Sequence, residues 1–286
     1  MNSFATIGVV GLGLIGGSFA KALKRNGFRV LGMVRDPAKA HAAQKAGAID
    51  EVADGAMLRR CDIVLIALPP AATLKFLRNH AGDFAPGAFV IDICGVKRGI
   101  CVEGWKIAAQ HGFRFVGGHP MAGKEKSGFA NSDAGLFAGA SMILCFEQAP
   151  AAEETAALRE FFLTLGFGEV VVTDPATHDR IIACTSQLAH VLSAAYIRNR
   201  AAREHAGFSA GSFRDMTRVA VMDPELWSEL FLDNRDFLAA EIDEVIATLA
   251  RFRDAIRGND RETLAALLRE SAAIKTEIAG RSPDRR

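Results

Sequence analysis

The chain has 286 residues, half of them hydrophobic, so it is long enough to bury one large core or two ordinary ones. Its 34 lysines and arginines against 33 acidic residues leave a formal net charge of +1, which excludes partners chosen by bulk charge, such as nucleic acid or an anionic membrane surface. No apolar run approaches the roughly 18 to 20 residues of a membrane helix, and the N-terminus lacks a signal-peptide pattern, so we expect a cytosolic protein without membrane association.

The first part of the chain alternates short β-branched runs with helical patterns. Residues 4–10 predict a strand, and a glycine-rich turn and an amphipathic helix ending at Gly27 follow it. Further strands are predicted at residues 28–34, 62–68, 88–93, 113–118, 141–146 and 169–174, with helices opened by Asp36-Pro37 and over 71–80 and 153–165. This alternation predicts an α/β fold with a doubly wound parallel sheet and helices on both faces.

Gly11, Gly13 and Gly16 form a G-x-G-x-x-G fingerprint between the first strand and the first helix. In this context backbone N–H groups and the helix dipole can accept the pyrophosphate of a dinucleotide. The other interpretation is a tight glycine turn that binds nothing. The predicted cofactor-binding residues of the turn are Gly11, Gly13, Leu14, Ile15 and Gly16.

The end of the second predicted strand bears on the choice between NAD and NADP. An acidic residue there binds the adenosine ribose, whereas an arginine accommodates the phosphate of NADP. Here the strand ends in Arg35 and Asp36, and Asp36 precedes Pro37, so it is equally suited to cap the next helix. We therefore favour NADP, held by Arg35, with NAD as the alternative.

The five cysteines are scattered along the chain without a C-x-x-C pair. This spacing argues against a disulfide framework and against a zinc or other metal site. We expect most of them to be reduced and buried, at positions Cys61, Cys94, Cys101, Cys145 and Cys184.

Beyond Asp174 the pattern is helical, with long stretches over residues 175–203, 224–257 and 261–279. Asp174-Pro175 and Asp223-Pro224 each read as an N-cap followed by proline at the first helical position, and Gly258 closes the middle helix. We predict two domains, a dinucleotide-binding domain over residues 1–173 and an all-helical domain over residues 174–286.

The middle helix carries an apolar seam in steps of four and three residues, and at 1.5 Å per residue the helix would be about 50 Å long. Such a seam packs either between two subunits or within one chain, and both alternatives stay open. The seam residues are Leu238, Ile242, Val245, Leu249, Phe252 and Ile256.

Residues 117–137, GGHPMAGKEKSGFANSDAGLF, begin where a strand ends on the cofactor side of the sheet. His119 is the natural proton acceptor for an alcohol that is being oxidised, because its ordinary pKa lies near neutral pH. The string GHPMAG followed by EKSG closely resembles the signature of the prephenate and arogenate dehydrogenases of tyrosine biosynthesis. Residues 91–100, 177–190 and 212–227 are similar to the same family, so the resemblance spans nearly the whole chain.

The resemblance implies a Rossmann-type domain, a helical dimerisation domain and a homodimer with its active site in a cleft. It also implies an NAD(P)-dependent oxidative decarboxylation, favouring prephenate, which yields 4-hydroxyphenylpyruvate, over arogenate, which yields tyrosine. In this family the residue at His119 takes the substrate's hydroxyl proton, and the arginine at Arg218 binds a carboxylate, for which a planar guanidinium is suited. The resemblance further assigns His178 and His190 to the substrate, with Ser186 and Gln187 on the same helical face as His190.

Two departures from the family pattern affect the site. Gly95, between Cys94 and Val96, stands where relatives often have a serine beside the catalytic histidine, so His119 needs another orienting partner, such as a backbone carbonyl or water. The S-H-L-P-H motif of some relatives reads S-Q-L-A-H at residues 186–190, which leaves recognition of the substrate side chain open.

Two other functions remain as alternatives. A β-hydroxyacid dehydrogenase joins similar domains but uses a lysine of the helical part, and the segment around His119 argues against it. A dinucleotide-sensing protein without catalysis is disfavoured by His119 and Arg218.

Overall fold

An eight-stranded sheet organises the first of the two compact units into which the chain divides, Met1–Arg235 and Asp236–Arg286. The computed structural model describes residues 4–281. All seven predicted strands are present, and a two-residue strand, β3, was not predicted. The strands are β1 (Thr6–Val10), β2 (Arg29–Met33), β3 (Glu51–Val52), β4 (Ile63–Ile66), β5 (Phe89–Asp92), β6 (Arg114–Pro120), β7 (Ser141–Cys145) and β8 (Glu169–Thr173).

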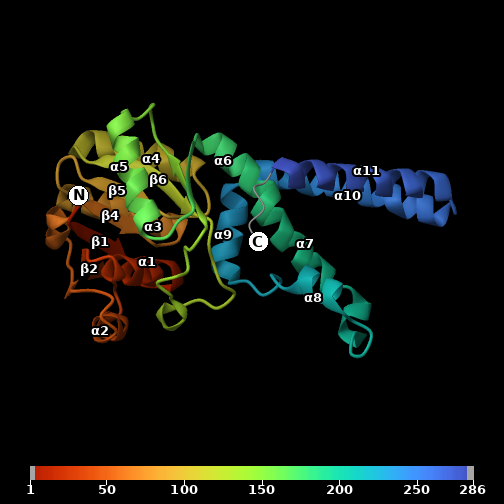
Figure 1. Cartoon of the computed structure of the whole chain (residues 1–286), viewed down its shortest axis with the longest axis horizontal. Coiled ribbons are helices and arrows are strands. Elements are labelled where there is room, and N and C mark those ends of the chain that lie inside the picture. Colours follow the sequence, from red (N-terminus) through yellow and green to blue (C-terminus); the bar gives the residue numbers. More distant parts are fainter. Residues whose placement is uncertain (1–3, 282–286) are drawn as a thin grey trace. The chain divides into compact units, whose positions relative to one another are not determined.

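The strand order β3-β2-β1-β4-β5-β6-β7-β8 makes the sheet doubly wound (Figure 1). Strands β2 and β3 are added on one side of β1, and β4 and the later strands are added on its other side. The sheet is mostly parallel, as predicted, but β6 and β7 pair antiparallel. A parallel neighbour requires a crossover connection. Between β6 and β7 the chain instead forms a loop with one 3-10 turn, Phe129–Asn131, and returns along the neighbouring strand in the opposite direction.

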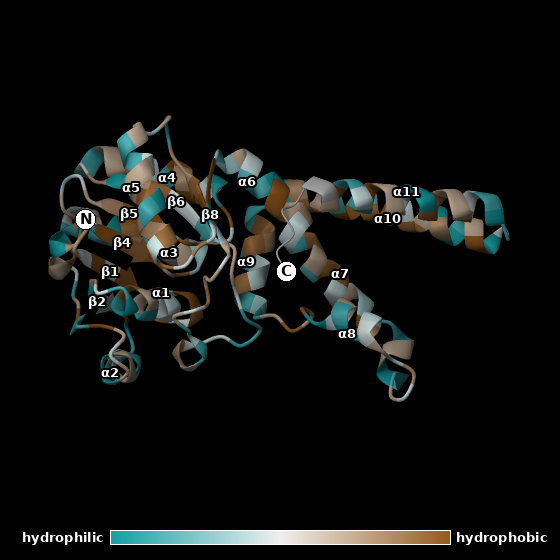
Figure 2. Cartoon of the chain, in the orientation of Figure 1, coloured by the Kyte–Doolittle hydropathy of each residue, from teal (hydrophilic) through white to brown (hydrophobic). Residues whose placement is uncertain are grey.

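Helices cover the sheet on both faces because its central strands are apolar on both faces. Ile63 and Leu65 of β4 join one core with Phe19, whereas Val64 and Ile66 join the opposite core. Figure 2 shows the corresponding hydrophobic colouring of the strands. The covering helices are α1 (Leu14–Arg25), α2 (Pro37–Lys45), α3 (Pro70–His80), α4 (Arg98–His111), which was not predicted, and α5 (Ala152–Thr164).

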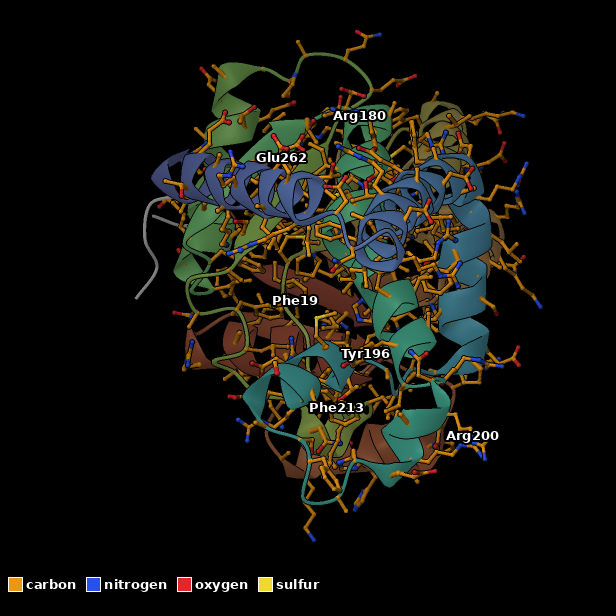
Figure 3. All side chains as sticks on the ribbon, turned by 90° about the vertical axis from the view of Figure 1, so that its right-hand side faces the viewer. Phe19, Arg180, Tyr196, Arg200, Phe213 and Glu262 are labelled. Atoms are coloured by element: carbon orange, nitrogen blue, oxygen red, sulfur yellow. The ribbon has the colours of Figure 1, made fainter. Side chains whose placement is uncertain are left out.

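After β8 the chain is helical, as predicted, and the expected helix over residues 175–203 is continuous but ends earlier, at Tyr196. It consists of α6 (Pro175–Ile182), a π-helical turn (Ala183–Leu188) and α7 (Ala189–Tyr196), and α8 (Gly211–Thr217) follows. Asp174 caps α6 as predicted, since its carboxylate accepts the N–H groups of Ala176 and Thr177. The rings of Tyr196 and Phe213, labelled in Figure 3, pack 5.9 Å apart and join α7 to α8.

The predicted helix over residues 224–257 is wrong in its length, because Asn234 divides it into α9 (Pro224–Asp233) and α10 (Arg235–Arg257). The Asn234 side chain is fully buried, and its amide donates to the carbonyl of Asp179 and to Oε1 of Gln187. These contacts hold its backbone at φ −117°, ψ 23°, outside the helical range. The helix α10 is therefore about 35 Å long instead of about 50 Å.

The second unit contains the rest of α10 and the helix α11 (Arg261–Arg281), and Gly258 follows α10 as predicted. Within residues 4–281, none of the helices combines the length and the apolar character that a membrane span requires. The predicted domain division after residue 173 stays a prediction.

Candidate active site

The site is built at one edge of the sheet. Strands β1, β4, β5 and β6 run parallel, so their carboxyl ends meet at this edge, where α/β proteins bind their ligands. The glycine turn leaves β1 there, Asp92 ends β5, and His119 is the penultimate residue of β6. The topology thus brings the predicted dinucleotide-binding turn and the predicted proton acceptor to the same side of the sheet.

Close contacts require two of the three glycines of the turn, Gly11 and Gly16. A Cβ atom on Gly11, whose φ is +87°, would lie 2.3 Å from the carbonyl oxygen of Ala67, and one on Gly16 would lie 1.8 Å from the carbonyl oxygen of Gly11. Gly13 faces open space, with no atom within 4 Å of an added Cβ, and as the N-cap of α1 it offers no side-chain cap. The first-turn N–H groups, including those of Leu14 and Ile15, are thereby open to an anion. The turn fits the pyrophosphate of NAD(P).

At the end of β2, Asp36 is the N-cap of α2, since its Oδ1 accepts the N–H of Ala38 at 2.9 Å. The capping interpretation of Asp36 is therefore the one that the structure shows. Arg35 is exposed, and within residues 4–281 it makes no ion pair. Its guanidinium is available to a phosphate group at the surface.

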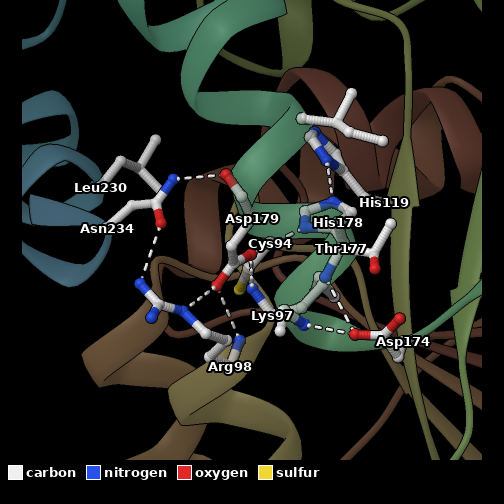
Figure 4. A network of polar contacts seen from close by, with 12 residues as sticks. Cys94, Lys97, Arg98, His119, Asp174, Thr177, His178, Asp179, Leu230 and Asn234 are labelled. Atoms are coloured by element: carbon white, nitrogen blue, oxygen red, sulfur yellow. Dashed lines mark hydrogen bonds and ion pairs between the residues drawn. The ribbon is translucent and has the colours of Figure 1, made fainter. Parts of the chain in front are cut away.

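The central feature of the site is a chain of two imidazoles and a carboxylate (Figure 4). Nδ1 of the half-buried His119 lies 2.9 Å from Nε2 of His178, and Nδ1 of His178 lies 2.7 Å from Oδ1 of Asp179. His178 and Asp179 are buried in α6. Asp179 also accepts the backbone N–H groups of Lys97 and Arg98, at 2.7 and 2.9 Å.

His178 supplies the orienting partner that His119 needs in the absence of the family's serine. The expected backbone carbonyl or water is replaced by the imidazole Nε2. The structure also accounts for Gly95, because a Cβ atom there would lie 3.3 Å from Cδ2 of Leu230, which packs over this position. A serine at residue 95 would require Leu230 to move.

The electrostatics of the site keep both histidines neutral. Burial, His178 and the buried Lys97 together hold the pKa of His119 well below its usual range. Burial also lowers the pKa of His178, although the hydrogen bond to Asp179 partly opposes this shift. Burial alone would raise the pKa of Asp179, but the hydrogen bonds from His178 and from the N–H of Arg98 outweigh it and leave the pKa lowered. At neutral pH this hydrogen-bonded row of side chains therefore consists of the Asp179 carboxylate and the two neutral imidazoles of His178 and His119.

Two of the predicted substrate-binding residues are committed to protein partners. Both ring nitrogens of His178 are engaged. The amide of the buried Gln187 donates to the carbonyl of Leu230 at 3.0 Å and accepts from Asn234 at 2.8 Å. Direct contacts of His178 and Gln187 with substrate stay a prediction, because both side chains are already hydrogen-bonded within the protein.

His190 and Ser186 are arranged differently. Nδ1 of His190 donates to the carbonyl oxygen of Ser186 at 2.9 Å, and its ring packs on Trp227 with 3.9 Å between the ring centroids. Both side chains are partly exposed. A polar ligand can reach them, so their predicted role in substrate binding stays a prediction.

Arg218 follows α8 and is exposed, and its Nη1 lies 2.9 Å from Oε1 of Glu125 in the loop after β6. An exposed ion pair of this kind contributes little to stability, about 0 to 1 kcal/mol. A substrate carboxylate can therefore replace Glu125 at Arg218 without a large penalty.

Sequence reasoning missed Asp179, Lys97 and Glu125. Asp179 directly follows His178, and adjacent helical residues do not normally face each other, so spacing gave no signal for the pair. The buried ion pair of Lys97 with Asp92 joins residues five apart, within the segment 91–100 that the family resemblance singled out, which was the available signal.

The chain is similar to known proteins in both sequence and fold. Residues 19–172 match the family model described as prephenate dehydrogenase, nucleotide-binding domain, and residues 174–270 match its dimerization domain. The chain is 32% identical to prephenate dehydrogenase of Bacillus subtilis over 268 residues, which cover 91% of this chain and 72% of that protein. Its fold is similar to that of Synechocystis arogenate dehydrogenase, with 27% identity, a TM-score of 0.81 and coverage of 96% and 99% of the two chains. Aquifex aeolicus prephenate dehydrogenase, in complex with hydroxyphenyl propionate and NAD+, gives 27% identity, a TM-score of 0.80 and the same coverage.

The lowered pKa of His119 predicts how this residue titrates. An unfolded histidine is half protonated near pH 6.5, whereas His119 in the folded protein should remain neutral until the pH falls well below that value. Since the unfolded state then binds the extra proton, this term lowers the free energy of unfolding as the pH falls below about 7.5, and it continues to do so until His119 is itself protonated in the folded protein. The imidazole C–H signals in NMR spectra, assigned with His119→Asn, measure the midpoint. A midpoint at or above pH 6.5 would contradict the prediction.

Proposed function

The chain belongs to the prephenate dehydrogenase family, and we propose that it catalyses the NAD(P)-dependent oxidative decarboxylation of prephenate to 4-hydroxyphenylpyruvate in tyrosine biosynthesis. The family match confirms the predicted resemblance, the Rossmann-type fold with a helical C-terminal part and the oxidoreductase class. It also confirms NAD(P) as the cofactor class. The observation that carries the proposal is the placement of a half-buried, neutral histidine at the sheet edge that holds the glycine turn.

In the proposed reaction His119 binds the substrate hydroxyl and removes its proton as the C–O bond becomes a carbonyl. NAD(P), held at the glycine turn of Gly11, Gly13 and Gly16, would supply the acceptor for the hydride of the same ring carbon. The ring carboxylate departs as carbon dioxide, its bonding electrons make the ring aromatic, and the phenolate oxygen takes the proton back. Arg218 holds a substrate carboxylate and orients the ring.

Arogenate is the second candidate substrate, and one observation favours it. Arogenate carries an ammonium where prephenate has a keto group. Glu125 places a carboxylate 2.9 Å from Arg218, so an acidic partner for an ammonium lies beside the predicted carboxylate-binding residue. The chain is similar both to a protein named prephenate dehydrogenase and to one named arogenate dehydrogenase.

The activity assay tests the proposal directly. Purified protein with prephenate or arogenate and either dinucleotide should produce reduced nicotinamide, and the ratio of kcat/KM identifies the substrate. His119→Asn should lower kcat by roughly a hundredfold or more, the usual range for a general base, while thermal unfolding and cofactor affinity stay near wild type. Near wild-type turnover of this variant would exclude His119 as the base.

Arg218→Ala should act mainly on substrate binding. Loss of a charge-assisted hydrogen bond, worth about 1.5 to 3 kcal/mol, should raise KM about tenfold or more. Arg214→Ala, which removes an exposed arginine one turn earlier in α8, is the matched control. If Glu125→Gln raised KM as much as Arg218→Ala does, the ion pair rather than the guanidinium would be what binding requires.

We also propose NADP as the preferred cofactor, supported by the exposed Arg35 at the end of β2. Arg35→Ala should weaken NADP binding selectively, and the difference should shrink at high salt because a surface charge contact is screened. Dissociation constants for both dinucleotides, measured by fluorescence titration, provide the test. A wild-type protein that already binds NAD more tightly would overturn the preference.

A homodimer formed through the C-terminal part, together with a domain division at residue 173, is a further part of the proposal. The dimerization-domain match over residues 174–270 supports it, as do apolar side chains that remain exposed in the second unit. These include Ile246, Leu249, Ile256, Leu268, Ile274 and Ile278.

The double variant Leu249→Ser/Ile256→Ser should shift the protein toward monomers in analytical ultracentrifugation, because it removes two side chains that are 58% and 63% exposed. Arg253→Ser, on the same helix, is the control. A wild-type protein that sediments as a monomer would refute the dimer.

We propose a cytoplasmic location, as expected of a biosynthetic enzyme that uses NAD(P). Fractionation of cells that produce the native chain tests this location, and recovery with membranes or in the medium would contradict it.

A further inference from the structure

We infer that Asp179 is a positioning residue that sets the tautomers of His178 and His119, so that His119 presents the lone pair of Nε2 to the substrate hydroxyl. This inference rests on the proposed function, because it explains how His119 is prepared as the base. Asp179 is not among the site residues that the sequence predicted.

The carboxylate of Asp179 is fixed by contacts other than the one to His178. Its oxygens accept the N–H groups of Lys97 and Arg98 and the Nε–H of Arg98, and the side chain is fully buried. An ionised carboxylate accepts hydrogen bonds and donates none. The atom of His178 that faces it, Nδ1 at 2.7 Å, must therefore carry a hydrogen.

The tautomer of His178 then determines that of His119. A neutral imidazole with a hydrogen on Nδ1 has a bare Nε2, which can only accept. Nε2 of His178 lies 2.9 Å from Nδ1 of His119, so His119 must donate from Nδ1. A neutral His119 with its hydrogen on Nδ1 keeps the lone pair of Nε2 free for a ligand, and the residue is only half-buried.

The same contacts stabilise the charge that forms during the reaction. When the substrate O–H bond breaks and the proton bonds to Nε2, His119 becomes an imidazolium whose Nδ1–H still points at the lone pair of His178. The Asp179 carboxylate polarises the ring of His178 and stays ionised throughout the reaction. After carbon dioxide leaves, Nε2 returns the proton to the phenolate oxygen, so the residues end as they began.

The opposite arrangement has a distinct signature. If His178 were an imidazolium paired with Asp179, its Nε2–H would donate to Nδ1 of His119, and the hydrogen of His119 would sit on Nε2. His119 would then have no lone pair for the substrate. The burial of His178, which disfavours its charged form, argues against this arrangement.

Nitrogen-15 NMR of the histidine-labelled full chain, without substrate, distinguishes the two arrangements. Long-range couplings between the ring C–H and nitrogen nuclei report the tautomer of each of the seven histidines, with assignments from His119→Asn and His178→Gln. We expect neutral rings with the hydrogen on Nδ1 for both His119 and His178. A hydrogen on Nε2 of His119, or a doubly protonated His178 at neutral pH, would overturn the inference.

Asp179→Asn tests the consequence for catalysis. An asparagine can donate its N–H to Nδ1 of His178, which reverses both tautomers. In Ser-His-Asp triads the equivalent change lowers kcat about 10⁴-fold, and we expect a loss of roughly 10² to 10⁴-fold here, with KM and cofactor affinity near wild type. Asp174→Asn, the same exchange at the N-cap of the same helix, is the control and should leave kcat unchanged. An Asp179→Asn enzyme with wild-type kcat would refute the inference.

A second pair of variants applies if Asp179→Asn does not fold, and it leaves Asp179 in place. His178→Gln offers an amide oxygen that can accept from Nδ1 of His119, whereas His178→Leu cannot. We expect His178→Gln to retain at least tenfold more turnover than His178→Leu, and equal losses would indicate a purely structural role. Should the wild-type protein turn over neither prephenate nor arogenate, the proposed function fails, while the NMR measurement still decides the tautomers independently.

Discussion

The carboxylate of Asp179 is the contact on which the site depends. It binds the N–H groups at the start of α4 and the ring of His178 in α6, and through that ring it reaches His119 on β6. Three elements that are distant in the sequence are thereby held in register at one edge of the sheet. Because the carboxylate is buried, the loss of any of its hydrogen bonds would leave a negative charge poorly solvated in the protein interior. The arrangement is therefore specified more sharply than surface contacts could achieve.

A second buried charge pair lies beside it. Lys97 and Asp92 are fully buried and paired, and the lysine cation helps to keep the neighbouring histidines neutral. The thiols around this pair are not activated by it, since burial raises the pKa of Cys94, and the pKa of Cys101 is raised by its hydrogen bond with Cys145 and by burial. Four of the five cysteines are buried and free, as predicted, and Cys184 is exposed.

The helix α9 packs against the site at Gly95, the position where the family resemblance would place a serine. Leu230 packs over Gly95, and its carbonyl oxygen accepts a hydrogen bond from Gln187. One turn later Asn234 ties α9 to Asp179 and Gln187. Gly95 thus lies under α9 close to Leu230, and the polar partner of His119 in this structure is His178.

Local patterns in the sequence determined seven of the eight strands, the glycine turn, the caps at Asp174 and Asp223 and the position of His119 at the end of a strand, because each depends on residues that are close along the chain. Other features depend on partners far along the chain. The direction of β7 followed from a loop without a crossover helix, and the break at Asn234 followed from buried hydrogen bonds to residues about 50 positions away. Glu125 meets Arg218 across 93 residues, and His119 meets His178 across 59. Only the tertiary structure decided these contacts, since buried polar groups choose partners by proximity in space and periodicity along a helix or strand carries no record of that choice.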